Sequence, residues 1–199
     1  MTVLTAANQL TLLRLLLVPV FVLCMLYAWP GWALAAFVVA GLTDALDGLI
    51  ARRTGQLTTL GAWLDPMADK LLLVTTFVML TLPGLNLVNR IPVWLTVLVI
   101  SRDVAIVLTV AVVNLAVARR TFRPSFLGKA ATAIYVVTAG VTLLANYLRR
   151  PSVVVTGLIY LSLAVTLASG FDYVVRMMRF GAAQPAETRG VGQDKRAAG

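Results

Sequence analysis

Six long apolar stretches constrain this chain more than any other feature of its sequence. Each is about 20 residues or longer, the length that an α-helix needs to cross the hydrocarbon core of a bilayer. Of its 199 residues, 60% are hydrophobic and only 13% are charged, whereas about a quarter of the residues in soluble domains are charged. The sequence therefore predicts an all-α, polytopic membrane protein with six transmembrane helices, at residues 10–29, 32–51, 62–82, 91–117, 127–148 and 153–177.

The distribution of arginine predicts how these helices are oriented. Arginines gather in the loops at 52–60 and 118–126 and after the sixth stretch, and cytoplasmic loops collect such charges. This rule places both ends of the chain in the cytoplasm, although Arg149 and Arg150 fall on the opposite side. No charged segment precedes the first apolar stretch and no small-residue cleavage site follows it closely, which favours a retained helix over a signal peptide.

Two regions follow from the composition along the chain. Residues 1–180 form the predicted transmembrane domain, whereas residues 181–199 are polar and rich in small residues, which predicts a disordered cytoplasmic tail. The net charge is +9, an excess that a membrane protein acquires from its cytoplasmic loops, so no nucleic-acid partner is expected.

Residue types that are scarce or absent limit the chemistry. The chain has no histidine, which excludes a histidine base and a histidine-ligated metal. Cys24 is the only cysteine, so neither a disulfide framework nor a thiolate metal cluster is available. Catalysis or binding must therefore depend on carboxylates, arginine and lysine.

Four aspartates inside the predicted spans require a compensating partner, because an Asp at a helix centre costs about 3 kcal/mol on insertion scales. Asp44 and Asp47 are three residues apart, and Asp65 and Asp69 are four apart, so each pair shares one helix face. A short loop makes these two helices antiparallel neighbours, and the four carboxylates then converge near their cytoplasmic end. Such all-oxygen ligands suit two Mg²⁺ or Mn²⁺ ions. A cation or proton transporter is the alternative from another class.

The segment between these aspartates carries a specific pattern. Residues 44–69 read DALDGLIARRTGQLTTLGAWLDPMAD, or D-x2-D-G-x2-A-R-x8-G-x3-D-x3-D. It resembles the signature of the CDP-alcohol phosphatidyltransferase family at every fixed place, and weaker similarity covers about residues 8–135. The resemblance implies transfer of a phosphatidyl group from CDP-diacylglycerol to a glycerol-type acceptor, with release of CMP. It also implies a homodimer in a bacterial-type inner (cytoplasmic) membrane, with the active site facing the cytoplasm.

The resemblance assigns roles to individual residues as well. Asp69 is the expected catalytic base and also a metal ligand. Small side chains beside the metal face let a nucleotide approach the helix backbone, although helix packing is the structural alternative. The expected metal ligands are Asp44, Asp47, Asp65 and Asp69, and the expected CDP-diacylglycerol-binding residues are Gly48, Ala51, Arg52 and Gly61.

Arg102 is a further costly charge, near the middle of the fourth span. Consecutive helical residues point to different faces, so Asp103 is not expected to neutralise it, and Arg102 is predicted to bind the acceptor phosphate. Arg119 and Lys129 are expected to assist, although Arg119 also fits a loop charge that only sets the topology.

The resemblance leaves two acceptors open. The opening Asn8, Thr11, Arg14 and Pro19 is similar to that of phosphatidylglycerophosphate synthases, which favours glycerol-3-phosphate. The residues around Arg102 are more similar to the cardiolipin synthase branch, which favours phosphatidylglycerol. We expect glycerol-3-phosphate first. A non-catalytic scaffold is disfavoured, since it need not keep four costly acids.

Overall fold

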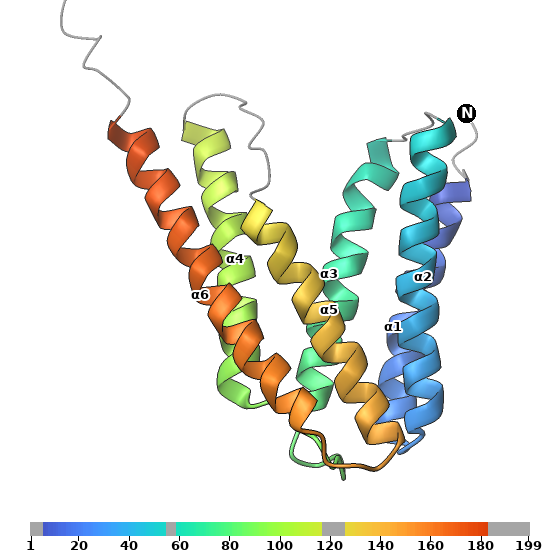
Figure 1. Ribbon diagram of the computed structural model, residues 1–199. Helices are drawn as coiled ribbons and strands as arrows, with labels where there is room; N and C mark the ends of the chain where they lie inside the picture. Colours follow the sequence, from blue (N-terminus) through green and yellow to red (C-terminus); the bar gives the residue numbers. More distant parts are fainter. Residues whose placement is uncertain (1–5, 55–58, 117–125, 183–199) are drawn as a thin grey trace, which may run out of the picture.

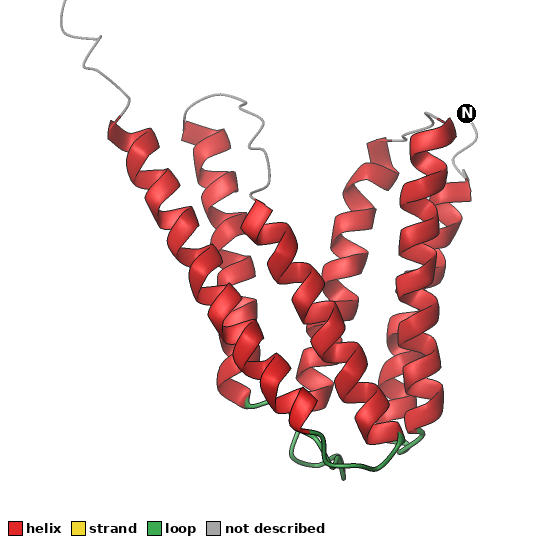
Figure 2. Cartoon of the chain, viewed as in Figure 1, coloured by secondary structure: helices red, strands yellow, loops and turns green. Residues whose placement is uncertain are grey.

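The computed structural model describes residues 6–54, 59–116 and 126–182 of the chain. Within these residues it contains six α-helices and no strand (Figure 2). Each helix overlaps one predicted span, with ends that differ by a few residues, so the predicted all-α class is confirmed. The helices are α1 (Ala6–Leu26), α2 (Pro30–Thr54), α3 (Thr59–Thr81), α4 (Val93–Ala116), α5 (Phe126–Tyr147) and α6 (Val153–Ala182).

The helices form two groups joined by α5 (Figure 1). On one side, α1 packs against α2 and α3; on the other, α4 packs against α6, and α5 contacts α2, α3 and α6. The start of α1 and the end of α6 lie at the same end of the molecule, together with the end of α2 and the start of α3 (Figure 1). The signature residues therefore lie at the end of the bundle that holds both termini of the described helices.

Many large apolar side chains are exposed on the outside of the bundle. Leu16, Leu108, Leu167 and Phe171 are among those with more than half of their surface uncovered. Within the described residues, three segments are long and apolar enough to cross a membrane, Gln9–Leu26, Leu127–Tyr147 and Val153–Tyr173. An apolar exterior of this kind is stable in lipid and not in water, so this is a membrane protein. The count of six spans stays a prediction.

The interface between α5 and α6 combines an apolar core with hydroxyl pairs. The Tyr135 ring packs edge-on against Phe77 of α3, with ring centroids 5.9 Å apart. The Tyr135 hydroxyl lies 2.6 Å from Thr166 Oγ1, and Thr138 Oγ1 lies 2.9 Å from Ser162 Oγ. These hydroxyls satisfy one another where no water is available, as buried polar groups must.

Two asparagines connect the loops at the opposite end of the molecule. The Asn89 backbone N–H donates to Asn146 Oδ1 (2.8 Å), and Asn146 Nδ2 donates back to the Asn89 carbonyl (2.9 Å). The Asn89 side chain also binds the backbone of the α5–α6 turn, at Arg150 and Ser152. This pair joins the α3–α4 connection to the α5–α6 connection and so ties the two helix groups together.

Candidate active site

A buried arginine on α1 connects two of the signature aspartates. Arg14 Nη2 lies 3.1 Å from Asp44 Oδ1 on α2, and Arg14 Nη1 donates to Asp69 Oδ1 on α3. The Arg14 side chain is 0% exposed, whereas those of Asp44 and Asp69 are 50% and 44% exposed. Arg14 therefore contacts both carboxylates from the interior of the bundle. We call these three residues the aspartate site.

The remaining signature residues lie on the same two helices. Asp47, Gly48, Ala51 and Arg52 belong to the final turns of α2, and Gly61 and Asp65 belong to the first turns of α3. Their side chains are outside the described part of the structure, as is Arg119 altogether. Asp44 and Asp69 are thus brought together as expected, while the convergence of all four carboxylates stays a prediction.

The packing around the aspartate site differs from the expected arrangement. We expected α2 and α3 to be direct neighbours, but α1 packs extensively against both of them. A short loop fixes the antiparallel direction of two helices but does not decide which third helix packs against both of them. The compensating charge consequently comes from α1, a helix outside the signature.

A second group, of three charged residues and one serine, lies on α3, α4 and α6. Arg102 Nη1 donates to Asp103 Oδ1 (2.7 Å), and Arg102 Nη2 donates to Ser169 Oγ on α6 (2.7 Å). Lys70 Nζ on α3 lies 3.3 Å from Asp103 Oδ2. We call these four residues the Arg102 cluster. Lys70 follows Asp69 directly in sequence, so the two groups meet on α3.

The expectation that Asp103 would not neutralise Arg102 is wrong. The two residues form an ion pair although they are consecutive on one helix. The face rule describes Cβ directions, and the long arginine side chain bends around the helix far enough to reach its neighbour. Lys129, the other residue expected to assist Arg102, is exposed on α5.

The sequence of this chain is similar to known proteins over most of its length. The model of the CDP-alcohol phosphatidyltransferase family matches residues 4–168 of this chain. The chain belongs to this family. This CDP-alcohol phosphatidyltransferase is therefore an integral membrane enzyme with a CDP-alcohol donor and an alcohol acceptor, and the transporter alternative is set aside.

Relatives of this phosphatidyltransferase fall into two named groups. It is 38% identical over 184 residues to a probable phosphatidylglycerophosphate synthase of Mycobacterium tuberculosis, covering 87% of this chain and 81% of that protein. It is 37% identical over 139 residues to a CMP-forming cardiolipin synthase of Streptomyces coelicolor, covering 65% and 60%. It is 33% identical over 186 residues to the human CMP-forming cardiolipin synthase, covering 85% and 60%. Both names concern anionic phospholipids.

The donor atoms of the aspartate site fit a hard divalent cation. Asp44 and Asp69 offer carboxylate oxygens on side chains that are about half exposed, and Mg²⁺ and Mn²⁺ prefer such ligands. Among the described side chains, which do not include those of Asp47 and Asp65, there is no group of three or more potential ligands. A bound ion of this type would supply charge neutralisation at the phosphate groups.

Three polar residues of the phosphatidyltransferase site were missed by the sequence analysis. Arg14 was noted only as part of a family pattern, and Lys70 and Ser169 received no role. Arg14 carried a usable signal, since a charge within an apolar span requires an anion. Ser169 carried none, because a single serine in a membrane helix is common and its partner lies 67 residues away.

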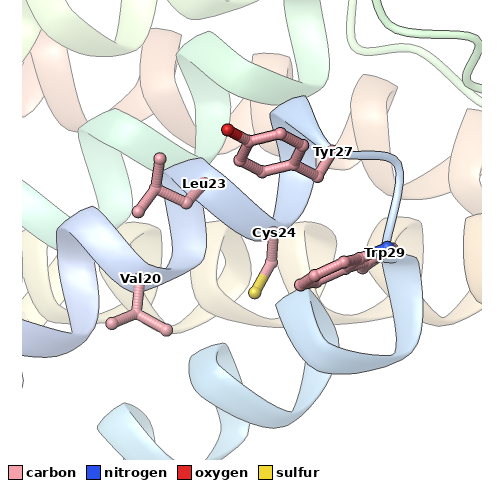
Figure 3. A pocket seen from close by; sticks show the side chains of 5 residues that line it. All are labelled: Val20, Leu23, Cys24, Tyr27 and Trp29. Carbon is pink, nitrogen blue, oxygen red and sulfur yellow. The ribbon is translucent and has the colours of Figure 1, made fainter.

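An apolar hollow elsewhere on the surface is not a candidate for the chemistry. It encloses about 320 Å³ beside the end of α1 and the turn that follows, and Figure 3 shows its five lining side chains. These are Val20, Leu23, Cys24, Tyr27 and Trp29. None of them carries a carboxylate or a cation, so the hollow lacks the groups that phosphoryl transfer requires.

Proposed function

We propose that this enzyme transfers the phosphatidyl group of CDP-diacylglycerol to glycerol-3-phosphate, acting as a phosphatidylglycerophosphate synthase. The observation that carries the proposal is the 38% identity to the mycobacterial relative of that name, which extends over most of both chains. The same acceptor is supported by the N-terminal motif, which is similar to that of phosphatidylglycerophosphate synthases and consists of Asn8, Thr11, Arg14 and Pro19.

In the proposed reaction, the acceptor hydroxyl attacks the phosphorus on the lipid side of the pyrophosphate. The bond from that phosphorus to the CMP oxygen breaks, CMP leaves with the electron pair, and Asp69 accepts the hydroxyl proton. Catalysis of this type depends mainly on positioning and on neutralising phosphate charge. A base must lie within hydrogen-bonding reach of the hydroxyl, and Asp69 of the aspartate site directly precedes Lys70 of the Arg102 cluster.

The Arg102 cluster supports an acceptor with a phosphate group. Lys70 and Arg102 together carry two positive charges against the single negative charge of Asp103, which leaves the cluster net positive. Because Lys70 adjoins Asp69, an acceptor phosphate held by this cluster would bring its hydroxyl toward the proposed base. We assign acceptor binding to Arg102, with Arg119 and Lys129 as proposed helpers.

The donor, CDP-diacylglycerol, is proposed to bind at the aspartate site, on the side of Asp69 away from the Arg102 cluster. Asp44, Asp47, Asp65 and Asp69 would hold two Mg²⁺ or Mn²⁺ ions, as the all-carboxylate donor set favours. Arg52 would contact a phosphate of the donor, and the small residues Gly48, Ala51 and Gly61 would let the nucleotide approach the backbone.

The setting of the reaction follows from the arginine distribution and from the family. We propose a homodimer in a bacterial-type cytoplasmic membrane, with the active site facing the cytoplasm. The loops at 52–60 and 118–126 carry the arginine excess, and the positive-inside rule places them in the cytoplasm. The polar segment after residue 180 is proposed to be a cytoplasmic tail.

A second acceptor, phosphatidylglycerol, is favoured by a separate observation. The human cardiolipin synthase is 33% identical over 85% of this chain, and the residues around Arg102 are similar to that branch. In this case the product is cardiolipin, and the same residues would bind the phosphate of the acceptor lipid.

Product identification with the purified enzyme separates these possibilities. The enzyme is supplied with CDP-diacylglycerol, Mg²⁺ or Mn²⁺, and either glycerol-3-phosphate or phosphatidylglycerol, and the lipids are analysed by mass spectrometry. We expect phosphatidylglycerophosphate and CMP from the first mixture, and no transfer in EDTA until the metal is restored. Cardiolipin from the second mixture alone would assign the other acceptor, and full activity without metal would refute the metal assignment.

A further inference from the structure

The Arg102 guanidinium is held by two different helices. Its side chain is only 9% exposed, and its two terminal nitrogens donate to Asp103 on α4 and to Ser169 on α6, both at 2.7 Å. Two anchored nitrogens fix the plane of a guanidinium group, because its donors lie in one rigid fork. Asp103 alone would leave the group free to rotate about that single contact.

The same guanidinium retains capacity for another acceptor. Its buried Nε–H has no hydrogen-bond partner among the described residues. A buried donor without a partner is costly, so its presence in a folded protein calls for an explanation. An anion that binds Arg102 would supply the missing acceptor, and the net positive charge of the cluster favours an anion.

We propose that Ser169 is a positioning residue for the acceptor phosphate, acting through Arg102. This inference rests on the proposed role of Arg102 in acceptor binding. The Ser169 side chain is 2% exposed, so it fixes the guanidinium from the interior and does not itself contact the substrate. Ser169 lies just beyond the family-matched residues 4–168, and it makes α6 a functional part of the acceptor site.

The chain provides a matched control for this serine. Ser162 lies two turns earlier on α6, is 0% exposed, and is paired with the Thr138 hydroxyl instead of a charged group. Replacing either serine by alanine removes one buried hydroxyl from the same helix. Only the change at position 169 removes a contact to Arg102. A general loss of α6 packing would therefore affect both variants, whereas loss of the Arg102 orientation would affect Ser169→Ala alone.

The test compares steady-state kinetics of Ser169→Ala and Ser162→Ala in the full-length enzyme. Glycerol-3-phosphate and, in parallel, phosphatidylglycerol in mixed micelles serve as acceptors. We expect Ser169→Ala to raise the acceptor KM roughly tenfold, the effect of losing one hydrogen bond to a charged group. Its KM for CDP-diacylglycerol should stay within about twofold of the wild-type value, as should both constants in Ser162→Ala.

Two further variants test whether the hydroxyl acts through Arg102. Ser169→Thr retains a hydroxyl and should keep an acceptor KM close to that of the wild type. In an Arg102→Ala background, Ser169→Ala should cause no additional rise, because residues that act through one contact are not additive. An unchanged acceptor KM in Ser169→Ala, an equal rise in Ser162→Ala, or a Ser169→Thr value as high as that of Ser169→Ala would overturn the proposal.

The outcome for Arg102→Ala separates this inference from the proposed function. If Arg102→Ala leaves the acceptor KM unchanged, the acceptor site has been placed wrongly, and the roles of both Arg102 and Ser169 are refuted while the proposed reaction is still tested by its product. If Arg102→Ala raises the acceptor KM while Ser169→Ala does not, only the role of Ser169 is refuted.

Discussion

At the scale of single residues, Arg14 joins three helices through one side chain. Its guanidinium is fully buried and joins α1 to carboxylates on α2 and α3. A buried cation between two acids is stabilising only while both kinds of partner are present, because removing one leaves an uncompensated charge. Arg14 thus makes α1 part of the aspartate site.

We expect Arg14→Gln to lower the stability of the metal-free enzyme. The two acids are about half exposed, so the loss should be about 1–3 kcal/mol, below the cost for a fully buried pair. The stability of Arg14→Lys should fall between those of Arg14→Gln and the wild type, since an ammonium keeps the charge but lacks the planar fork of a guanidinium. Thermal unfolding in detergent is the measurement. Arg90→Gln is the control, because Arg90 is exposed and its hydrogen bonds within the described part of the chain go to the carbonyls of the neighbouring loop. Equal melting temperatures for Arg14→Gln and the wild type would contradict this account.

The aspartates should separate into a base and a ligand when each is changed to asparagine. Asp69→Asn should abolish turnover while CDP-diacylglycerol binding largely survives, because a base acts on the acceptor. Asp44→Asn should instead weaken Mn²⁺ binding, as followed by electron paramagnetic resonance. Normal turnover in Asp69→Asn would exclude it as the base, and loss of Mn²⁺ binding in that variant would make it chiefly a ligand.

At the scale of helices, the sequence predicted where the helices lie along the chain better than it predicted which helices contact one another. Runs of about 20 apolar residues identify membrane helices strongly, since lipid allows few other structures, and all six predicted spans overlap helices of the structure. Hydropathy does not specify which helices touch, so the position of α1 against both α2 and α3 was missed. The contact from Arg102 to Ser169 joins α4 to α6. It could not be predicted from the sequence, because neither residue belongs to a repeating pattern in its helix.

The connection between the two helix groups should depend on the asparagine pair. Asn146→Ala removes both the acceptor of the Asn89 N–H and the donor to the Asn89 carbonyl. Unsatisfied buried groups cost about 1–3 kcal/mol each, so unfolding should occur at a clearly lower temperature. Asn86→Ala changes an exposed asparagine of the same loop and should have little effect. Equal melting temperatures for the two variants would show that the pair contributes nothing to stability.

At the scale of the whole molecule, the arrangement makes a prediction about sidedness. The start of α1 and the end of α6 lie at the same end of the bundle (Figure 1). This agrees with the even number of predicted spans. The arginine distribution places this end in the cytoplasm. Position 84, in the connection between α3 and α4, should then lie on the opposite side of the membrane.

Labelling of single cysteines measures this sidedness directly. Cys24→Ala removes the only cysteine, and Gly84→Cys or Gln193→Cys is added to that background. Gly84 has open space around its backbone, so a side chain fits there. A membrane-impermeant maleimide should label position 84 only in right-side-out vesicles and position 193 only in inside-out vesicles, with both reacting in detergent. Labelling of both positions from one side would contradict the six-span arrangement.

The buried position of Arg14 also has a consequence for biosynthesis. Its partner Asp69 lies 55 residues further along the chain, and ribosomes add about 5–20 residues per second. Asp69 is therefore synthesised about 3–11 s after Arg14 at these rates. During this interval the first helix enters the bilayer with a cation that its eventual neighbours do not yet neutralise. The long side chain can reach toward the cytoplasmic interface until the third helix arrives, so the interior of the bundle closes around Arg14 only after the third helix has been made.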